Sequence, residues 1–305
     1  TCQPHPAEHA TEPQRRAAGS VAFARMRIGN LWLLLPAVVV VLVFFALPVA
    51  LIVPQSAYRD GRFTWDVYAS VLTDSYYALV LWRSLWLSFV STVVCILLAY
   101  PIAYYATRLA GRKYKRYIYM IVLAPLFTTA VVRVLAWTII LGNQGIINTL
   151  SQALGLTDAP IRMLYTETAI MTGLVYTMVP FAVLTIGAVL ENLDGRLEES
   201  ARDLGATPLG AFLRVTLPLS APGVSAGAIL VFALCLSAYV TPALLGGGRI
   251  KVMASLIFEQ FMRTSNWPLG SGIACLLLIF TGVVIFAYGR ALDRRVSAGL
   301  ESRRA

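Results

Sequence analysis

Long runs of apolar residues alternate with shorter polar segments along this 305-residue chain. A helix crosses roughly 30 Å of hydrocarbon with about 20 residues. Six runs reach that length and predict membrane-spanning helices at 31–53, 85–107, 117–141, 169–190, 223–245 and 271–289. We expect the first run to stay as an anchor, because it is longer than the apolar core of a signal peptide. The predicted fold class is all-α, a polytopic membrane protein with six transmembrane helices.

Composition supports this class, since 58% of the residues are hydrophobic and only 13% are charged. A mean hydropathy of +0.72 excludes an ordinary soluble domain. The predicted domains are a mobile cytoplasmic tail at 1–28, a six-helix membrane domain at 29–292 with a cytoplasmic loop at 191–221, and a basic cytoplasmic tail at 293–305.

The positions of Lys and Arg predict the orientation. Of 25 such residues, 17 lie in segments on the same side as the amino terminus, seven lie in the opposite loops, and Arg133 alone lies within a predicted span. Cytoplasmic loops carry the excess of these residues, so both termini are predicted to be cytoplasmic. The net charge of +10 then reflects topology and attraction to anionic lipid. Basic and aromatic residues do not alternate along the chain as they do on a protein surface that binds nucleic acid, so we expect no nucleic-acid partner.

Enzymatic and metal chemistry find no support in the sequence. The predicted spans contain no His, Asp or Glu that could supply a nucleophile and its base. The four cysteines show no paired spacing, so neither a disulfide nor a metal site is expected. The segment 246–251 lacks the residue order of a phosphate-binding loop. We therefore predict a noncatalytic chain that binds no cofactor and takes its energy from a partner.

Two predicted outer segments differ in character. Segment 54–84 is rich in Trp and Tyr, which is typical of residues at the headgroup level of a membrane. Segment 142–168 begins with Gly and Asn and continues with an apolar stretch, which predicts an outer turn followed by a partly embedded helix.

The predicted cytoplasmic loop 191–221 contains helix start and stop signals. Asp194 can cap a helix whose apolar stripe is Leu197, Ala201 and Leu204, and Gly205 can supply a left-handed cap at its end. Glu199 and Arg202 lie three residues apart on this helix and could pair.

A second helix start signal follows directly in the same loop. Thr207 can cap and Pro208 can occupy the first position of another short helix, which Leu217 and Pro218 would end. The pattern predicts a helix-turn-helix on the cytoplasmic face, and the alternative is a connector that lies on the membrane surface.

This loop resembles the EAA motif of the permease subunits of ABC importers, whose pattern is Glu-Ala-Ala, a Gly four residues later and Ile-x-Leu-Pro further on. The matching residues are Glu199, Ser200 and Ala201, then Gly205, then Val215, Leu217 and Pro218. Ser for Ala and Val for Ile are the two departures. The resemblance implies a type I ABC importer permease fold and a coupling helix that docks into a groove of a cytoplasmic ATPase. With Thr207 and Pro208, these residues form the expected ATPase-coupling site.

The resemblance extends over nearly all of 30–290, and its finer likeness is to spermidine/putrescine-type permeases. The stretches that carry it are 132–137, 141–148, 240–247 and 266–271. It implies a bacterial inner-membrane location and a small solute, with a polyamine favoured and phosphonate, iron or an opine-like solute as alternatives. The implied partners are an ABC ATPase dimer that binds ATP and Mg²⁺, a second and different permease subunit, and an external solute-binding protein.

Candidate pathway residues are Arg133, Trp137 and Glu259. A charge within a span is by default a functional hypothesis, although Arg133 could instead have a structural role by capping backbone carbonyls. An Arg in the path of a polyamine would repel it, and no predicted span holds a carboxylate to attract it. Rival functions are a secondary carrier driven by protons or sodium and a membrane scaffold, but a carrier's usual internal repeat and polar midplane site are not evident.

Overall fold

The computed structural model describes residues 31–59, 62–63 and 65–301. The predicted tail 1–28 and residues 302–305 lie outside the described residues. Contacts between residues are dense within each of two units of the chain, Thr1–Gln55 and Ser56–Ala305.

The described part of the first unit is an apolar helical run. It comprises α2 (Leu31–Val41), a π-helical turn (η1, Leu42–Ala46) and α3 (Leu47–Ala57), which continues into the second unit. Pro48 has no N–H to donate to the carbonyl one turn earlier, and the wider π turn lies at that place. Leu35–Ala57 is long and apolar enough to cross a membrane, as predicted for 31–53.

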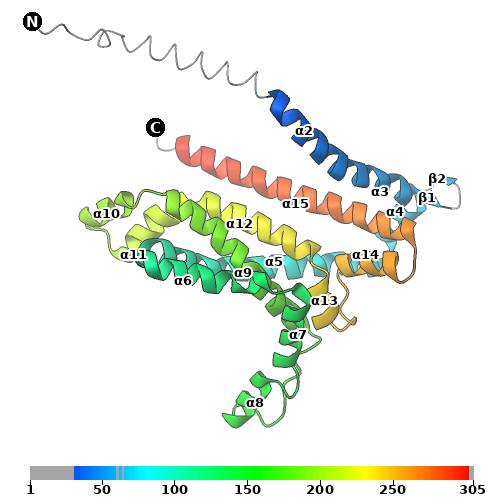
Figure 1. Cartoon of the computed structure of the whole chain (residues 1–305), viewed down its shortest axis with the longest axis horizontal. Helices are drawn as coiled ribbons and strands as arrows, with labels where there is room; N and C mark the ends of the chain where they lie inside the picture. Colours follow the sequence, from blue (N-terminus) through cyan, green and yellow to red (C-terminus); the bar gives the residue numbers. More distant parts are fainter. Residues whose placement is uncertain (1–30, 60–61, 64, 302–305) are drawn as a thin grey trace, which may run out of the picture. The chain divides into compact units, whose positions relative to one another are not determined.

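The described residues of the second unit form helices and one short antiparallel ribbon, joined by turns and loops, and Figure 1 shows these elements. In chain order these are β1 (Tyr58–Arg59), β2 (Arg62–Phe63), α4 (Asp66–Thr73), α5 (Ser75–Tyr104), η2 (Tyr105–Leu109), α6 (Arg112–Leu123), η3 (Ala124–Phe127), α7 (Ala130–Ile140), α8 (Ile146–Ala153), α9 (Glu167–Asn192), α10 (Arg196–Asp203), α11 (Pro208–Ala211), η4 (Phe212–Thr216), α12 (Leu217–Ser237), α13 (Val240–Leu245), α14 (Met253–Met262) and α15 (Trp267–Glu301).

Helices α5, α9 and α12 pack against one another and form the main core (Figure 1). Fully buried Leu87, Ile186 and Val231 come from the three helices in turn. A Cβ atom at Gly223 of α12 would lie 2.6 Å from Val189 Cβ of α9. The missing side chain therefore lets the two helices approach closely, which is how small residues promote helix packing where lipid supplies little driving force.

A second core lies where α4, α5, α14 and α15 meet, around Val80, Met253 and Ile273. Buried Ser84 links two of these helices. Its Oγ donates to the Val80 carbonyl at 2.7 Å and accepts from the Met253 backbone N–H at 2.8 Å. The backbone of α14 thus gains a partner for an N–H of its first turn, which has none within its own helix.

The second predicted span begins earlier than its apolar run. Asp74 Oδ1 accepts from the Tyr76 N–H at 2.8 Å and caps α5, which starts at Ser75. Residues 75–84 of the predicted outer loop are therefore helix. The apolar pattern missed them because a helix continues beyond the hydrocarbon wherever a cap and internal hydrogen bonds sustain it.

The third predicted span, 117–141, is not straight. Its two halves, Arg112–Phe127 and Ala130–Ile140, meet at 98°. Pro125 cannot donate to a carbonyl of α6, and Thr129 Oγ1 starts a new helix by accepting from the Val132 N–H at 3.4 Å. Five helices in the described residues are long and apolar enough to span a membrane, and the count reaches six if this bent pair is one broken span.

The fifth predicted span, 223–245, is also broken. The helix that contains its start, α12, ends at Ser237, Ala238 is extended, and α13 begins at Val240. The ring of Pro242 would clash with the carbonyl of Ala238 in a continuous helix. The last helix, α15, is longer than predicted. It continues to Glu301 and so includes residues 293–301 of the predicted basic tail.

Segment 142–168 contains the predicted short helix, α8, and one buried amide secures it. Asn148 is 1% exposed, and its Nδ2 donates to the carbonyls of Gly142 and Ile161 at 3.0 Å each. Its Oδ1 accepts from the Ile161 N–H at 2.9 Å. Both sides of the loop are therefore tied to one side chain.

We predict that Asn148→Ala destabilises this loop by about 1–3 kcal/mol, because three partly buried backbone groups lose their hydrogen-bond partner. Hydrogen exchange at residues 142–165 should speed up several-fold. Thr149→Ala, which changes the exposed neighbour, should leave exchange unchanged. Equal exchange in both variants would contradict this role of Asn148.

Candidate functional site

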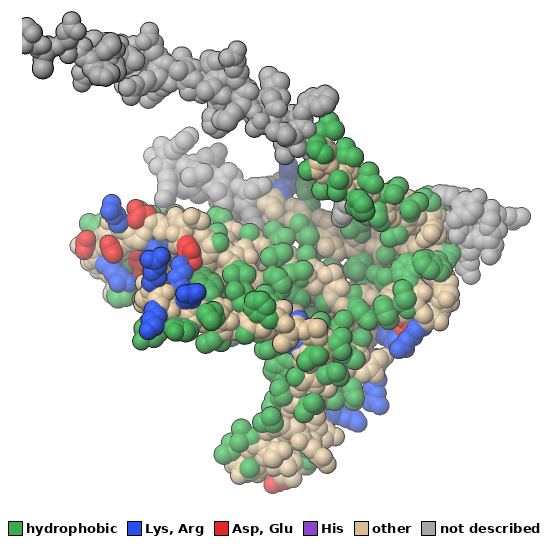
Figure 2. All heavy atoms as spheres, in the orientation of Figure 1, with side chains coloured by type: hydrophobic (Ala, Val, Ile, Leu, Met, Phe, Trp, Pro, Cys, Tyr) green, Lys and Arg blue, Asp and Glu red, His purple; other side chains and the backbone are tan. Residues whose placement is uncertain are grey.

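The first candidate site is the loop around α10, at the end of the molecule where charged side chains gather (Figure 2). Asp194 Oδ1 accepts from the Arg196 N–H at 3.0 Å, so the predicted cap is confirmed, with Gly195 between it and the helix. Gly205 follows the helix with φ +90°. The Ala206 N–H reaches the Ala201 carbonyl at 3.0 Å. These contacts are those of a left-handed C-terminal cap.

The predicted second start is also confirmed. Thr207 Oγ1 accepts from the Gly210 N–H at 3.1 Å, and Pro208 is the first residue of α11. The predicted stop at Leu217 and Pro218 is wrong, because α11, η4 and α12 form one helical run from Pro208 to Ser237. The π turn η4 spans the carbonyl that Pro218 cannot reach, so the helix passes the proline without ending.

The loop therefore presents one short surface helix beside the beginning of a membrane helix. Its outward leucines are Leu197 at 48% exposed, Leu204 at 89% and Leu209 at 66%. Of the expected coupling residues, Glu199, Ser200, Gly205, Thr207, Pro208, Leu217 and Pro218 are exposed, while Ala201 and Val215 are half-buried. Leu197 and Leu204 of the predicted apolar stripe thus face outward, whereas Ala201 is partly covered.

Glu198 faces the opposite way and was missed by the sequence reasoning. It is 8% exposed and accepts three hydrogen bonds: from Tyr104 Oη at 2.8 Å, Thr216 Oγ1 at 2.9 Å and Arg202 Nη2 at 2.8 Å. The pairing expected between Glu199 and Arg202 is wrong, because Arg202 pairs with Glu198 one turn earlier. Two adjacent glutamates look alike in the sequence, and only their partners distinguish them.

The pKa of Glu198 reflects two opposed effects. Burial raises it, while the hydrogen bonds from Tyr104 and Thr216 and the charge of Arg202 lower it. The net pKa lies below the usual glutamate value, so these partners outweigh the cost of burial. Glu198 is therefore ionised at neutral pH, and its interactions stabilise the folded loop.

Three side chains from η2 and α6 also contact the segment that leads from α9 into this loop. Arg108 Nη2 of η2 donates to the Leu193 carbonyl at 2.9 Å. Lys115 Nζ and Tyr119 Oη of α6 reach Glu191 Oε1 at 2.8 and 3.2 Å. The cytoplasmic loop predicted from its sequence signals is thus tied to its neighbours at both its start and its middle.

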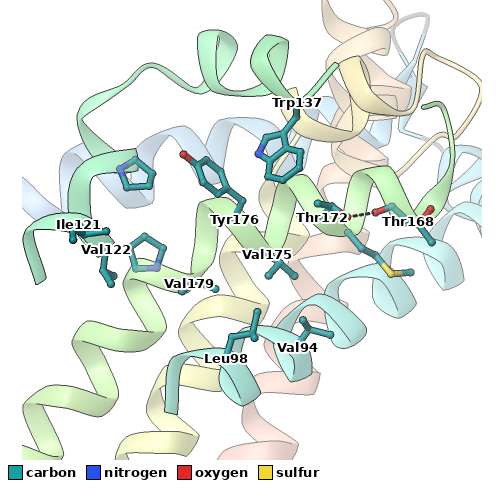
Figure 3. A pocket seen from close by; sticks show the side chains of 13 residues that line it. Val94, Leu98, Ile121, Val122, Trp137, Thr168, Thr172, Val175, Tyr176 and Val179 are labelled. Carbon is teal, nitrogen blue, oxygen red and sulfur yellow. Dashed lines mark hydrogen bonds between the residues drawn. The ribbon is translucent and has the colours of Figure 1, made fainter. Parts of the chain in front are cut away.

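The second candidate site is an apolar cavity of about 590 Å³ (Figure 3). Helices α5, α6, α7 and α9 and the turn η3 line it with Val94, Leu98, Ile121, Val122, Pro125, Trp137, Thr168, Met171, Thr172, Val175, Tyr176, Val179 and Pro180. The rings of Trp137 and Tyr176 meet edge to face with centroids 5.5 Å apart. The cavity lies beside the break between α6 and α7, so the bend of the third predicted span gives it part of its wall.

The three candidate pathway residues do not come together. Trp137 lines the cavity, whereas Arg133, one turn earlier on α7, does not. The Nε and Nη1 atoms of Arg133 are buried without a hydrogen-bond partner in the described part of the chain. Glu259 lies on α14 and pairs with Lys251. Between residues 31 and 301, with the gaps in description noted above, no group of three His, Cys, Asp or Glu could hold a metal ion.

Residues 96–298 match the family described as binding-protein-dependent transport system inner membrane component. The chain is 37% identical to the spermidine/putrescine transport system permease protein PotB of Haemophilus influenzae, over 84% of this chain and 92% of that protein. Identity to PotB of Escherichia coli K12 is 33%, over 75% and 82% of the two chains.

The fold is similar to that of a chain in the crystal structure of a bacterial ABC transporter involved in the import of the acidic polysaccharide alginate. The TM-score is 0.73 at 18% identity, covering 90% of this chain and 99% of that one. The predicted fold class, an all-α polytopic permease of the ABC type I importer kind, is confirmed.

We predict that Glu198→Gln lowers the thermal midpoint of the purified protein at pH 7, and that the difference from the unmodified protein narrows as the pH falls. A carboxylate with a lowered pKa contributes stability above its unfolded pKa and loses it as the pH falls through the folded pKa. The window therefore lies at and below the usual glutamate range. Glu199→Gln, at the exposed neighbour, should show no such narrowing, and a difference for Glu198→Gln that is constant with pH would contradict the assignment.

Proposed function

The chain belongs to the family of binding-protein-dependent transport system inner membrane components and is a membrane permease of an ABC importer, and from this premise we propose that it is the noncatalytic subunit of a polyamine importer. The choice of a polyamine as the solute is supported by the 37% identity to a spermidine/putrescine permease over 84% of the chain. The ATPase, a second permease and an external binding protein complete the proposed complex.

The exposed leucines around α10 support docking on an ATPase. A short helix with outward apolar residues and charged neighbours suits a groove on a partner protein. In this proposal Leu204 and Leu209 enter the groove, and Gly205 sets the angle between α10 and α11. ATP and Mg²⁺ bind to the ATPase, and two ATPase subunits serve the permease pair, which we take to consist of two different chains.

The proposed orientation follows from the same surface. In this proposal the loop at 191–221 is cytoplasmic, because it contacts a cytoplasmic ATPase. The amino terminus and the end of α15 then lie on the same side when the bent pair of α6 and α7 counts as one of six spans. Arg112, Lys113 and Arg116 at the start of α6 are exposed, and their neighbour Lys115 pairs with Glu191 at the start of this loop. Cytoplasmic loops carry such an excess of positive charge.

The cavity supports passage of a cationic solute in spite of Arg133. That residue lies outside the cavity wall, whereas Trp137 and Tyr176 present aromatic rings to it. An ammonium group near an aromatic face gains about 0.5–2 kcal/mol. The methylene chain of a polyamine would meet the apolar side chains around these rings. Alternating access would then open this path to one side of the membrane at a time.

We predict that Gly205→Val weakens ATPase binding and uncouples ATP hydrolysis from uptake. A β-branched residue at φ +90° is strained by more than about 1 kcal/mol, although its Cβ atom would meet no neighbour within 4 Å. Tagged protein purified from its native membrane should retain less ATPase, and uptake per ATP should fall about tenfold, equivalent to roughly 1.4 kcal/mol.

Gly205→Asn is the matched control, because Asn tolerates the left-handed conformation better than other residues with a side chain. It should retain most of both activities. Wild-type uptake in Gly205→Val would exclude the proposed docking surface, and purification of the unmodified chain without any ATPase would favour a self-sufficient carrier.

We predict that vesicles containing the complete importer accumulate labelled spermidine or putrescine when ATP is present on the cytoplasmic side. Trp137→Leu should lower this uptake about two- to tenfold through loss of the cation–aromatic contact. Trp82→Leu, at an exposed tryptophan of α5 outside the cavity, should have little effect. An importer that ignores both polyamines but carries another solute would refute the proposed substrate class and leave the permease assignment intact.

A further inference from the structure

The contacts of Glu198 continue into the membrane bundle through a row of aromatic rings. The ring of Tyr104, whose hydroxyl donates to Glu198, meets Phe212 of η4 edge to face at 5.0 Å between centroids. Phe212 in turn meets Tyr100 edge to face at 5.7 Å. Tyr100 Oη and Ser220 Oγ of α12 are hydrogen-bonded at 2.7 Å.

These residues connect α10 and the nearby start of the α12 run with the end of α5, which lies about 90 residues earlier in the sequence. Glu198 belongs to the surface helix α10, Tyr104 and Tyr100 to the end of α5, and Phe212 and Ser220 to the run that begins the membrane helix α12. Glu198, Tyr100 and Ser220 are all buried. We call this set the Glu198–Ser220 cluster.

The hydrogen bonds of Glu198 oppose movement of α10 relative to its neighbours. A buried carboxylate with three donors loses much more when one donor leaves than an exposed ion pair does, because the charge is then left partly unsatisfied. An exposed pair is worth only about 0–1 kcal/mol and would let the helix shift at little cost. The Glu198 contacts therefore hold α10 in one position relative to α5 and η4.

We propose that Glu198 and Tyr104 are positioning residues that make α10 move as one body with the cytoplasmic ends of α5 and α12. The inference rests on the proposed docking of α10 on an ATPase. A displacement imposed on α10 would then pass through the Glu198–Ser220 cluster to two helices of the membrane core. Glu199, exposed on the next position, is free to face the partner, so the two adjacent glutamates have different tasks.

The test uses the complete importer in vesicles, with labelled spermidine uptake and ATP hydrolysis measured on the same samples. Tyr104→Phe keeps the ring against Phe212 and removes only the hydroxyl that reaches Glu198. Uptake per ATP should fall about five- to tenfold while the amount of ATPase in the complex stays the same. Tyr105→Phe, at the exposed neighbouring tyrosine, is the matched control and should leave the ratio unchanged.

Glu198→Gln provides a second, independent variant, and the double variant completes a cycle. Because Tyr104 acts through its hydrogen bond to Glu198, the double variant should lose little more than Glu198→Gln alone. Thermal midpoints of all four complexes separate coupling from stability. A purely structural role would lower uptake and ATP hydrolysis together and leave their ratio unchanged.

Each remaining outcome is decisive. A wild-type ratio in both single variants would overturn the inference alone, provided the unmodified complex is coupled. Fully additive losses would show that Glu198 and Tyr104 do not act together and would also overturn it. If the unmodified chain assembles with no ATPase, the docking proposal itself fails, and this inference fails with it.

Discussion

The hydrocarbon interior of the membrane constrains every other feature of this protein, because it offers no water to an unpaired backbone N–H or carbonyl. Helices satisfy those groups internally, so the spans are helices, and some of the prolines within them change the helix locally. At Pro48 and Pro218 a π turn forms and the helix continues. At Pro125 and Pro242 the helix breaks instead. The bend and the cavity wall both follow from the break near Pro125.

The same constraint gathers the charges at the ends of the bundle, where they can perform different tasks (Figure 2). Glu198 is the notable case, since it is buried but lies just outside the spans and receives three donors. Its ionised form is stabilised there, whereas an unpaired charge deeper in the bundle would be costly. A firmly held α10 and an exposed row of leucines are therefore parts of one surface, one side anchored and the other available to a partner.

The cavity and the loop that carries α10 lie on the same helices, which would link the proposed solute path to the proposed ATPase contact. Helix α9 contributes Tyr176 to the cavity and leads directly into the loop that carries α10. Helix α5 contributes Val94 to the cavity and Tyr104 to the Glu198 contacts. A shift of α10 would thus reach the cavity through two rigid helices rather than through a flexible connection.

The sequence by itself determined the class of protein, the helical spans and the capping signals at Asp194, Gly205 and Thr207, because these depend on local composition and local hydrogen bonds. It did not predict the breaks near Pro125 and Pro242, and it wrongly expected Pro218 to end a helix. A proline can end, bend or merely interrupt a helix, and neighbouring turns decide which. Only the tertiary structure distinguished Glu198 from Glu199 and brought Trp137 beside Tyr176. Those relations depend on partners about 40 to 90 residues away, and no local pattern records them.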